Sequence, residues 1–198
     1  WTSFAVDSNT MCIGLDMFLG DEFPWYSSVG EPDYMRTHRR KEYIPVSVFT
    51  TLYRIGVPIK TQDKSLLELM LQKGKEKYFI HKILPEAPDS LIFGFSSRQI
   101  EWCEKNEAWA YNFFVKNQLI YSKDAQNIMP YVTEGPFARG MEAANADEKS
   151  TPGNIGSWIG YKMIQSYAAQ HPEMKLPEII AKNFSAETFL NDAKYKPR

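Results

Sequence analysis

The segment 63–84, DKSLLELMLQKGKEKYFIHKIL, decides the fold class of this 198-residue chain. Asp63 is placed to cap a helix that runs to about Leu84, because Pro85 follows and cannot continue it. One face of that helix repeats at i, i+3, i+4 and i+7, and consists of Leu67, Met70, Leu71, Gly74, Tyr78 and His81. A mid-helix Gly is roughly 1 kcal/mol less favourable than Ala, so we expect another backbone or a bulky ring to lie close to Gly74. His81 is interpreted as a hydrogen-bonded core histidine.

A second helix carries the same kind of feature. It is predicted to begin with Thr151 as N-cap and Pro152 in the first position, and to run to about Gln170. Gly156 and Gly160 stand one turn apart on one side of it, a spacing that lets a neighbouring helix approach closely. We interpret this ridge as a packing device between helices of one domain.

The segment from Ser96 to about Tyr121 predicts a third long helix. Ser96 and Gln99 have the spacing of a capping box. Apolar residues occupy two sides of this helix and together form an arc of roughly 200°, which is wider than a surface helix needs. Glu107 lies inside the arc and must be paired, hydrogen-bonded or protonated. It is either a structural carboxylate or a metal ligand or general base, and its candidate partners are His81, Arg139, Tyr78 and the backbone amides of 134–140.

The rest of the chain predicts one strand and several short helices. The apolar run from Thr10 to Leu19, which contains Asp16, is the strand candidate. The short helices are expected at 46–55, 123–131, 175–183 and 186–193, and the polar stretch 141–150 is expected to be a mobile surface loop. The predicted fold is a single domain over 1–198, mostly α and α+β at most, with the strand against helices 63–84 and 97–120.

Composition excludes several classes of function. The formal net charge of −1 gives no Lys/Arg surplus for nucleic acid. No apolar run approaches the roughly 20 residues of a membrane span. Cys12 and Cys103 are interpreted as small buried residues. The three histidines, His38, His81 and His171, are too far apart for an HExxH helix, so we expect no metal and no cofactor.

A short basic run, His38-Arg39-Arg40-Lys41, leaves two interpretations open. It is either a solvated helix end, where cations are favoured, or a phosphate or anionic-lipid site.

An ordered set of segments resembles the gliding-motility lipoprotein GldB family of the bacterial cell envelope. The matching stretches are Gly14 to Gly20, Gly74-Lys75 within Met70 to Tyr78, Leu84 to Asp89, Gln99 to Cys103, Asn106-Glu107 to Phe114, Glu134 to Phe137, Pro152 to Tyr161, and Phe189-Leu190. The resemblance implies a lipid-anchored protein of the periplasm or outer membrane, with other cell-envelope proteins as partners. It also implies that the chain is about the C-terminal two-thirds of a longer ectodomain. Membrane contact would then come only through an N-terminal lipid anchor absent from this chain.

The family is also distantly similar to zincin-like metallopeptidases, which implies a zincin-like helical domain. The corresponding helix here reads Leu71-Gln72-Lys73-Gly74-Lys75-Glu76-Lys77 and lacks the two imidazoles and the glutamate base of a zinc peptidase. The resemblance then implies that Glu107 is a remnant acid on the helix that once faced the metal. We therefore expect a non-catalytic binding or scaffolding component. The alternative is a metal-dependent or unusual hydrolase around Glu107, with His81 and Asp16 as further candidates.

Overall fold

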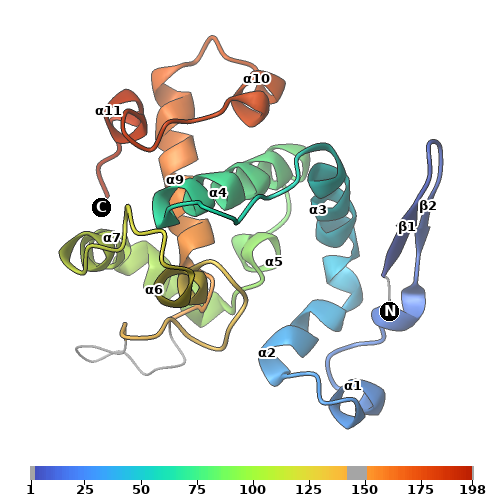
Figure 1. Ribbon diagram of the computed structural model, residues 1–198. Helices are drawn as coiled ribbons and strands as arrows, with labels where there is room; N and C mark the ends of the chain where they lie inside the picture. Colours follow the sequence, from blue (N-terminus) through green and yellow to red (C-terminus); the bar gives the residue numbers. More distant parts are fainter. Residues whose placement is uncertain (1–2, 142–150, 198) are drawn as a thin grey trace.

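A computed structural model describes residues 3–141 and 151–197, which are mostly helical and contain one small sheet (Figure 1). Within these ranges, no helix combines the length and apolar character that crossing a membrane requires. The elements are, in chain order, β1 (Phe4–Val6), β2 (Met11–Ile13), η1 (Leu15–Met17), α1 (Pro24–Ser28), α2 (Asp33–Arg36), η2 (Thr37–Arg39), η3 (Lys41–Tyr43), α3 (Ile44–Gly56), α4 (Leu66–Ile83), α5 (Asp89–Phe93), α6 (Ser97–Lys105), α7 (Glu107–Lys116), α8 (Ala125–Ile128), η4 (Met129–Tyr131), α9 (Ile155–Gln170), α10 (Leu176–Ala181) and α11 (Phe189–Ala193).

The centre of the domain is the crossing of α4 and α9 (Figure 1). A Cβ atom on Gly74 would overlap the carbonyl carbon of Gly160, and one on Gly160 would overlap the main-chain oxygen of Met70. A Cβ on Gly156 would lie 2.7 Å from the carbonyl oxygen of Tyr131. The predicted close approach at all three glycines is confirmed, because only residues without a Cβ let these backbones come so near.

Both central helices begin later than the sequence predicts. Ser65, and not Asp63, caps α4: its hydroxyl accepts from the Glu68 amide, and the Glu68 carboxylate accepts from the Ser65 amide. Asp63 itself has a left-handed backbone, with φ of 56°, and belongs to the preceding turn. Likewise α9 starts at Ile155 after Asn154, so Thr151 and Pro152 precede the helix instead of opening it.

The helix predicted over 96–121 is two helices. The capping box of Ser96 and Gln99 is confirmed at the start of α6. The helix ends at Asn106, whose φ of −123° and ψ of 19° are not helical, and whose side-chain amide donates to the Trp102 carbonyl at 2.9 Å. Asparagine competes with helical backbone bonds in this way. Glu107 therefore stands in the first turn of a new helix, α7, and not in the middle of a long one.

The strand prediction over 10–19 is correct only for Met11–Ile13. Those residues pair antiparallel with β1, which the sequence analysis missed, in the register Phe4↔Ile13, Ala5↔Cys12 and Val6↔Met11. The chain turns into η1 directly after β2. The hairpin lies beyond α3, on the side of the molecule away from α6 and α7 (Figure 1), so the predicted packing against helices 63–84 and 97–120 is wrong.

The remaining predictions are partly confirmed. The helix expected at 46–55 is α3, and the C-terminal helices are the shorter α10 and α11. The segment 123–131 divides into α8 and η4, with Pro130 inside η4. Cys12 is exposed in β2, contrary to prediction, whereas Cys103 is buried. The loop expected at 141–150 lies outside the described residues except for Met141, which is fully buried and so is not a surface residue.

Candidate functional site

Four successive residues in the middle of α4, Gly74 to Lys77, are all buried, each against a different part of the fold. Gly74 faces α9 at Gly160. Lys75 reaches the end of α10, Glu76 pairs with Arg54 of α3, and Lys77 reaches α5. The central helix is therefore enclosed on every side, and its charged residues act as links to the helices around it.

The two buried lysines donate to main-chain carbonyls. Lys75 Nζ lies 2.9 Å from the carbonyl oxygen of Ile180 and 3.0 Å from that of Lys182. Lys77 Nζ lies 2.7 Å from the carbonyl oxygen of Ile92. Burial lowers the pKa of both ammonium groups, because a charge is poorly solvated inside the protein.

Glu76 is the most enclosed acid of this segment, with 1% of its side chain exposed. Arg54 meets it with two hydrogen bonds, at 2.6 Å from Nε and 2.9 Å from its terminal nitrogen. Burial opposes the charge on Arg54, but the paired carboxylate outweighs it and the pKa of Arg54 rises. The pair joins α3 to α4 and leaves the carboxylate fully engaged.

The helical periodicity of this segment did not predict that Lys75, Glu76 and Lys77 are buried. One signal was present, since apolar residues precede them on all sides of the helix rather than on one face: Leu66, Leu67, Leu69, Met70 and Leu71 are all buried. A helix that is apolar all round is enclosed by the rest of the protein. Charges that follow on the same helix must then find partners.

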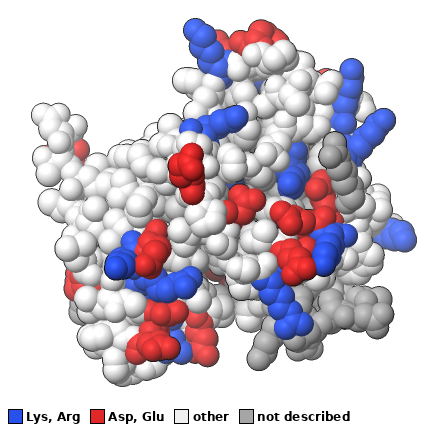
Figure 2. Space-filling view, turned by 180° about the vertical axis from the view of Figure 1, so that it is seen from behind, with Lys and Arg blue, Asp and Glu red and all other residues white. Residues whose placement is uncertain are grey.

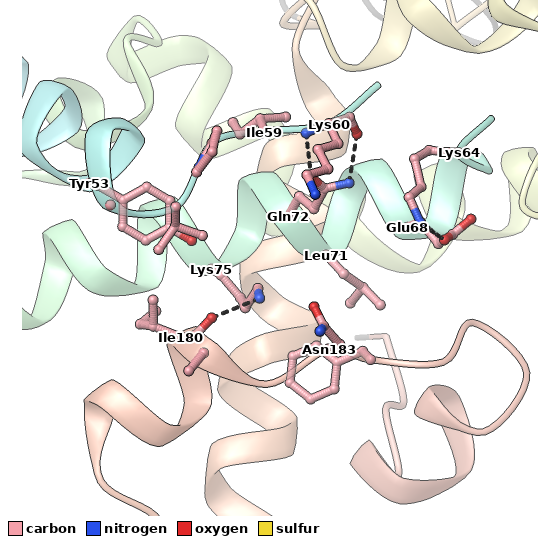
Figure 3. A pocket seen from close by; sticks show the side chains of 15 residues that line it. Tyr53, Ile59, Lys60, Lys64, Glu68, Leu71, Gln72, Lys75, Ile180 and Asn183 are labelled. Atoms are coloured by element: carbon pink, nitrogen blue, oxygen red, sulfur yellow. Dashed lines mark hydrogen bonds and ion pairs between the residues drawn. The ribbon is translucent and has the colours of Figure 1, made fainter. Parts of the chain in front are cut away.

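A groove of about 610 Å³ runs along the Lys75 side of α4 (Figure 3). We call it the α4 groove. Segment 57–64, which connects α3 to α4, forms one wall, and the chain after α10 forms the other. Its lining residues are Tyr53, Gly56, Val57, Pro58, Ile59, Lys60, Lys64, Glu68, Leu71, Gln72, Lys75, Ile180, Ala181, Asn183 and Phe184.

A single glutamine fixes the connecting segment along this groove. The Lys60 amide donates to Gln72 Oε1 at 2.8 Å, and Gln72 Nε2 donates to the Lys60 carbonyl at 2.9 Å (Figure 3). A smaller hollow of about 360 Å³ lies on the other side of this segment and is lined partly by Arg54 and Lys73. The connecting segment thus divides two hollows.

Glu107 is buried, as predicted, but its partner was not among the expected candidates. Tyr195, in the C-terminal tail, donates its hydroxyl to Glu107 Oε1 at 2.9 Å. Burial and the neighbouring carboxylate raise the pKa of Tyr195, so the hydroxyl stays protonated and donates. Tyr111 packs edge-on against the Tyr195 ring, at 5.5 Å between centroids. The contact anchors the tail on α7.

The other two candidate residues lie elsewhere. His81, near the end of α4, is partly exposed, and its Nδ1 stands 3.6 Å from Asp89 Oδ1. This nitrogen has no hydrogen-bond partner within the described residues, so His81 is not the hydrogen-bonded core residue that was expected. Its ring packs on Tyr161. Asp16 is exposed in η1, beside the hairpin, and its carbonyl accepts from Tyr26. Glu107, His81 and Asp16 thus belong to α7, α4 and η1 and have separate contacts. In Figure 1, α7 and the β1–β2 hairpin that precedes η1 lie on opposite sides of α4. In residues 3–141 and 151–197, no three His, Cys, Asp or Glu side chains gather as metal ligands.

The basic run at 38–41 is engaged with neighbouring side chains. Arg39 makes a forked pair with Glu31, with its nitrogens 2.6 to 3.0 Å from the carboxylate oxygens. Arg40 lies over the Tyr43 ring and 3.9 Å from Asp21. On the face shown in Figure 2, basic and acidic side chains are intermingled. Arg39 and Arg40 are therefore engaged within the N-terminal segment, which weighs against the anion site without making the run the solvated helix end of the other interpretation.

Comparison with known proteins gives one match. The model of a family described as gliding motility protein GldB matches residues 1–197, which is nearly the whole chain and confirms the resemblance found in the sequence. Searches of curated proteins and of solved structures find no match.

Proposed function

The chain belongs to the GldB family of gliding motility proteins, and from this premise we propose that it is a non-catalytic binding or scaffolding component of a surface motility machinery. The proposal includes its location: the cell envelope, in the periplasm or at the outer membrane, where a lipid anchor holds the full-length lipoprotein. Its partners are other proteins of that machinery.

One observation carries the non-catalytic part of the proposal. If the distant resemblance to zincin-like peptidases holds, segment 71–77 of α4 takes the place of their HExxH, and here its central residues serve packing and internal pairing. Gly74 contacts Gly160, Lys75 holds the end of α10, and Glu76 is paired with Arg54. A general base must reach a water or substrate, and a carboxylate bonded to a guanidinium on both oxygens is poorly placed to take up a proton. We propose that the domain retains a peptidase-like arrangement without the chemistry.

The alternative is a hydrolase that uses Glu107, His81 and Asp16. Among the described residues, Glu107 bonds to Tyr195, His81 packs on Tyr161, and the Asp16 carbonyl accepts from Tyr26. These separate contacts favour the non-catalytic proposal, since a base and the group it activates must lie within hydrogen-bond reach. Glu107 is also occupied by Tyr195 in a contact that holds the tail.

The proposal is tested in a gliding bacterium whose chromosomal copy is replaced by variants. A triple variant, Asp16→Asn with His81→Ala and Glu107→Gln, removes the candidate chemistry but keeps the acceptor for Tyr195. We expect normal protein abundance and normal surface movement. Gly160→Leu, which disrupts the helix crossing, should abolish both and serves as the control for loss of folding.

Loss of movement in a triple variant that is abundant and correctly folded would favour the hydrolase. A second readout uses the purified protein: treatment with EDTA should leave its melting temperature unchanged, because a bound ion would stabilise the native state by mass action. A fall that zinc restores would contradict the proposal.

A further inference from the structure

The α4 groove has the size and composition of a small-molecule site. Its volume of about 610 Å³ falls within the range typical of ligand pockets, roughly 300–1,000 Å³. Its floor is apolar, since Leu71 and Ile180 are buried and Phe184 is partly buried. Among the polar groups that line it, Tyr53 of α3 and Lys75 of α4 lie beside this floor and have donors to offer (Figure 3).

The first polar group is the Lys75 ammonium, which lies between Leu71 and Ile180 in the groove (Figure 3). The lysine is 7% exposed and donates to the carbonyls of Ile180 and Lys182. An ammonium has three N–H donors, so one remains for a ligand. The ring centroid of Phe184 stands 5.6 Å from the nitrogen, at the distance of a cation–π contact.

The second polar group is the Tyr53 hydroxyl. Tyr53 is 4% exposed and lies at one end of the groove (Figure 3). Within the described part of the chain its hydroxyl has no hydrogen-bond partner. Buried polar groups are normally hydrogen-bonded, so an unsatisfied hydroxyl beside a cavity marks a position that a ligand can fill. Burial and the nearby Glu76 raise the pKa of Tyr53, so this hydroxyl remains a donor.

The charge of the groove is positive. Three lysines, Lys60, Lys64 and Lys75, face one acid, Glu68. Glu68 is already occupied by Lys64 Nζ at 2.6 Å and by the Ser65 amide at 2.9 Å. Among the described residues, no carboxylate forms an ion pair with Lys60 or Lys75. The groove therefore offers two cations and an O–H donor without a counter-ion.

We propose that the α4 groove binds an organic carboxylate that carries an apolar group. One carboxylate oxygen accepts a hydrogen bond from Lys75 and the second oxygen accepts one from Tyr53. The apolar group packs on Leu71, Ile180 and Phe184. Hydrogen bonds from charged donors to a carboxylate are the strong ones in proteins. A phosphate is less well matched, because its larger charge and three acceptor oxygens require more donors than Lys75 and Tyr53 supply. The inference stands on the groove alone and does not depend on the motility role.

The experiment compares two probes that differ only in the headgroup. N-acetyl-L-phenylalanine has a carboxylate, and N-acetyl-L-phenylalanine amide has the same apolar group without the charge. Both are titrated into the ¹⁵N-labelled protein and followed by NMR. We expect the acid to shift amide signals of segments 57–64, 71–75 and 180–184, and the amide to bind at least about tenfold more weakly, since a hydrogen bond between charged groups is lost.

Variants assign the contacts. Tyr53→Phe keeps the ring and removes the donor, and should weaken binding of the acid about tenfold. Lys75→Met should abolish the preference for the acid over the amide. Because Lys75 also holds the end of α10, Lys60→Gln gives a second test at the exposed rim, where we expect a weakening of about threefold. Lys105→Met, at an exposed pair with Glu101 on α6, is the control and should bind normally.

Several outcomes overturn the proposal: equal affinity for acid and amide, signal shifts spread outside the groove, or an unchanged affinity in Tyr53→Phe. Tighter binding of phenyl phosphate than of the acid would also overturn the carboxylate assignment. If neither probe binds at millimolar concentration, the proposed headgroup recognition is wrong, whereas the proposed motility role is unaffected.

Discussion

The crossing of α4 and α9 and the N-terminal segment 3–43 are built in opposite ways. At the crossing, long helices approach so closely that a single Cβ atom would separate them. In the N-terminal segment, a short hairpin and several helices of one turn surround one fully buried side chain, Tyr26. The Tyr26 hydroxyl accepts from the Leu19 amide at 3.1 Å and donates to the Asp16 carbonyl at 2.9 Å. Close helix packing stabilises the crossing, whereas a few hydrogen bonds stabilise the N-terminal segment.

Exposure follows the same division. Large apolar side chains on the N-terminal segment remain open to solvent, as in Leu15 at 63% and Val29 at 57%, whereas Trp158 of α9 is fully buried. A region that buries little apolar surface opens at a lower free energy than the core of the same domain. These differences predict that substitutions at the crossing lower the free energy of unfolding more than substitutions in the N-terminal segment do.

The largest effect is expected at the crossing. Gly160→Leu forces α4 and α9 apart because any side chain there meets the Met70 backbone, and we expect a loss of about 3 kcal/mol or more in the free energy of unfolding, measured by urea denaturation. Gly56→Ala is the matched control, since a Cβ at Gly56 meets open space. A Gly160→Leu protein as stable as the parent would show that the two helices are not in contact there.

The next effect concerns the tail on α7. Glu107→Leu leaves the Tyr195 hydroxyl without its acceptor, and we expect a loss of about 1–3 kcal/mol. Glu107→Gln keeps an acceptor oxygen and should lose less than about 1 kcal/mol. Thermal unfolding of both variants, with Tyr195→Phe as the reciprocal change, measures the difference. Equal stability of the Leu and Gln variants would contradict a structural role for the acid.

A smaller and more local effect is expected in the N-terminal segment. Tyr26→Phe removes both hydrogen bonds of the hydroxyl and should lower the local stability by about 1–2 kcal/mol. Hydrogen exchange should accelerate for amides between 11 and 30 and remain unchanged for α4. If α4 amides accelerate equally, the two regions unfold as one unit and the comparison fails.

The smallest effect is expected at the exposed apolar residues of the same segment. Leu15→Ser should change the free energy of unfolding by less than about 0.5 kcal/mol, because the side chain is 63% exposed and loses little burial. Urea denaturation monitored by circular dichroism is sufficient to measure it. A loss above 1 kcal/mol would mean that this surface is covered in the folded protein.

Local pattern alone predicted much of this architecture. The periodicity of 63–84 predicted α4, since a helical repeat fixes which residues share a face. The glycines at 74, 156 and 160 predicted close packing at those positions, but not which elements meet there. The capping box at Ser96 and the burial of Glu107 were also readable, and so was the family. The helical repeat and the capping box depend on residues three or four positions apart, so they can be recognised in the sequence alone.

What only the tertiary structure decided are the contacts between distant segments. Lys75 meets Ile180 across 105 residues, and Glu107 meets Tyr195 across 88. The Tyr53 hydroxyl of α3 is buried beside the groove along α4 and has no hydrogen-bond partner within the described residues. No local periodicity encodes such pairs: burial of a charge at 75–77 depends on which helices enclose α4, and that is settled when the whole chain packs.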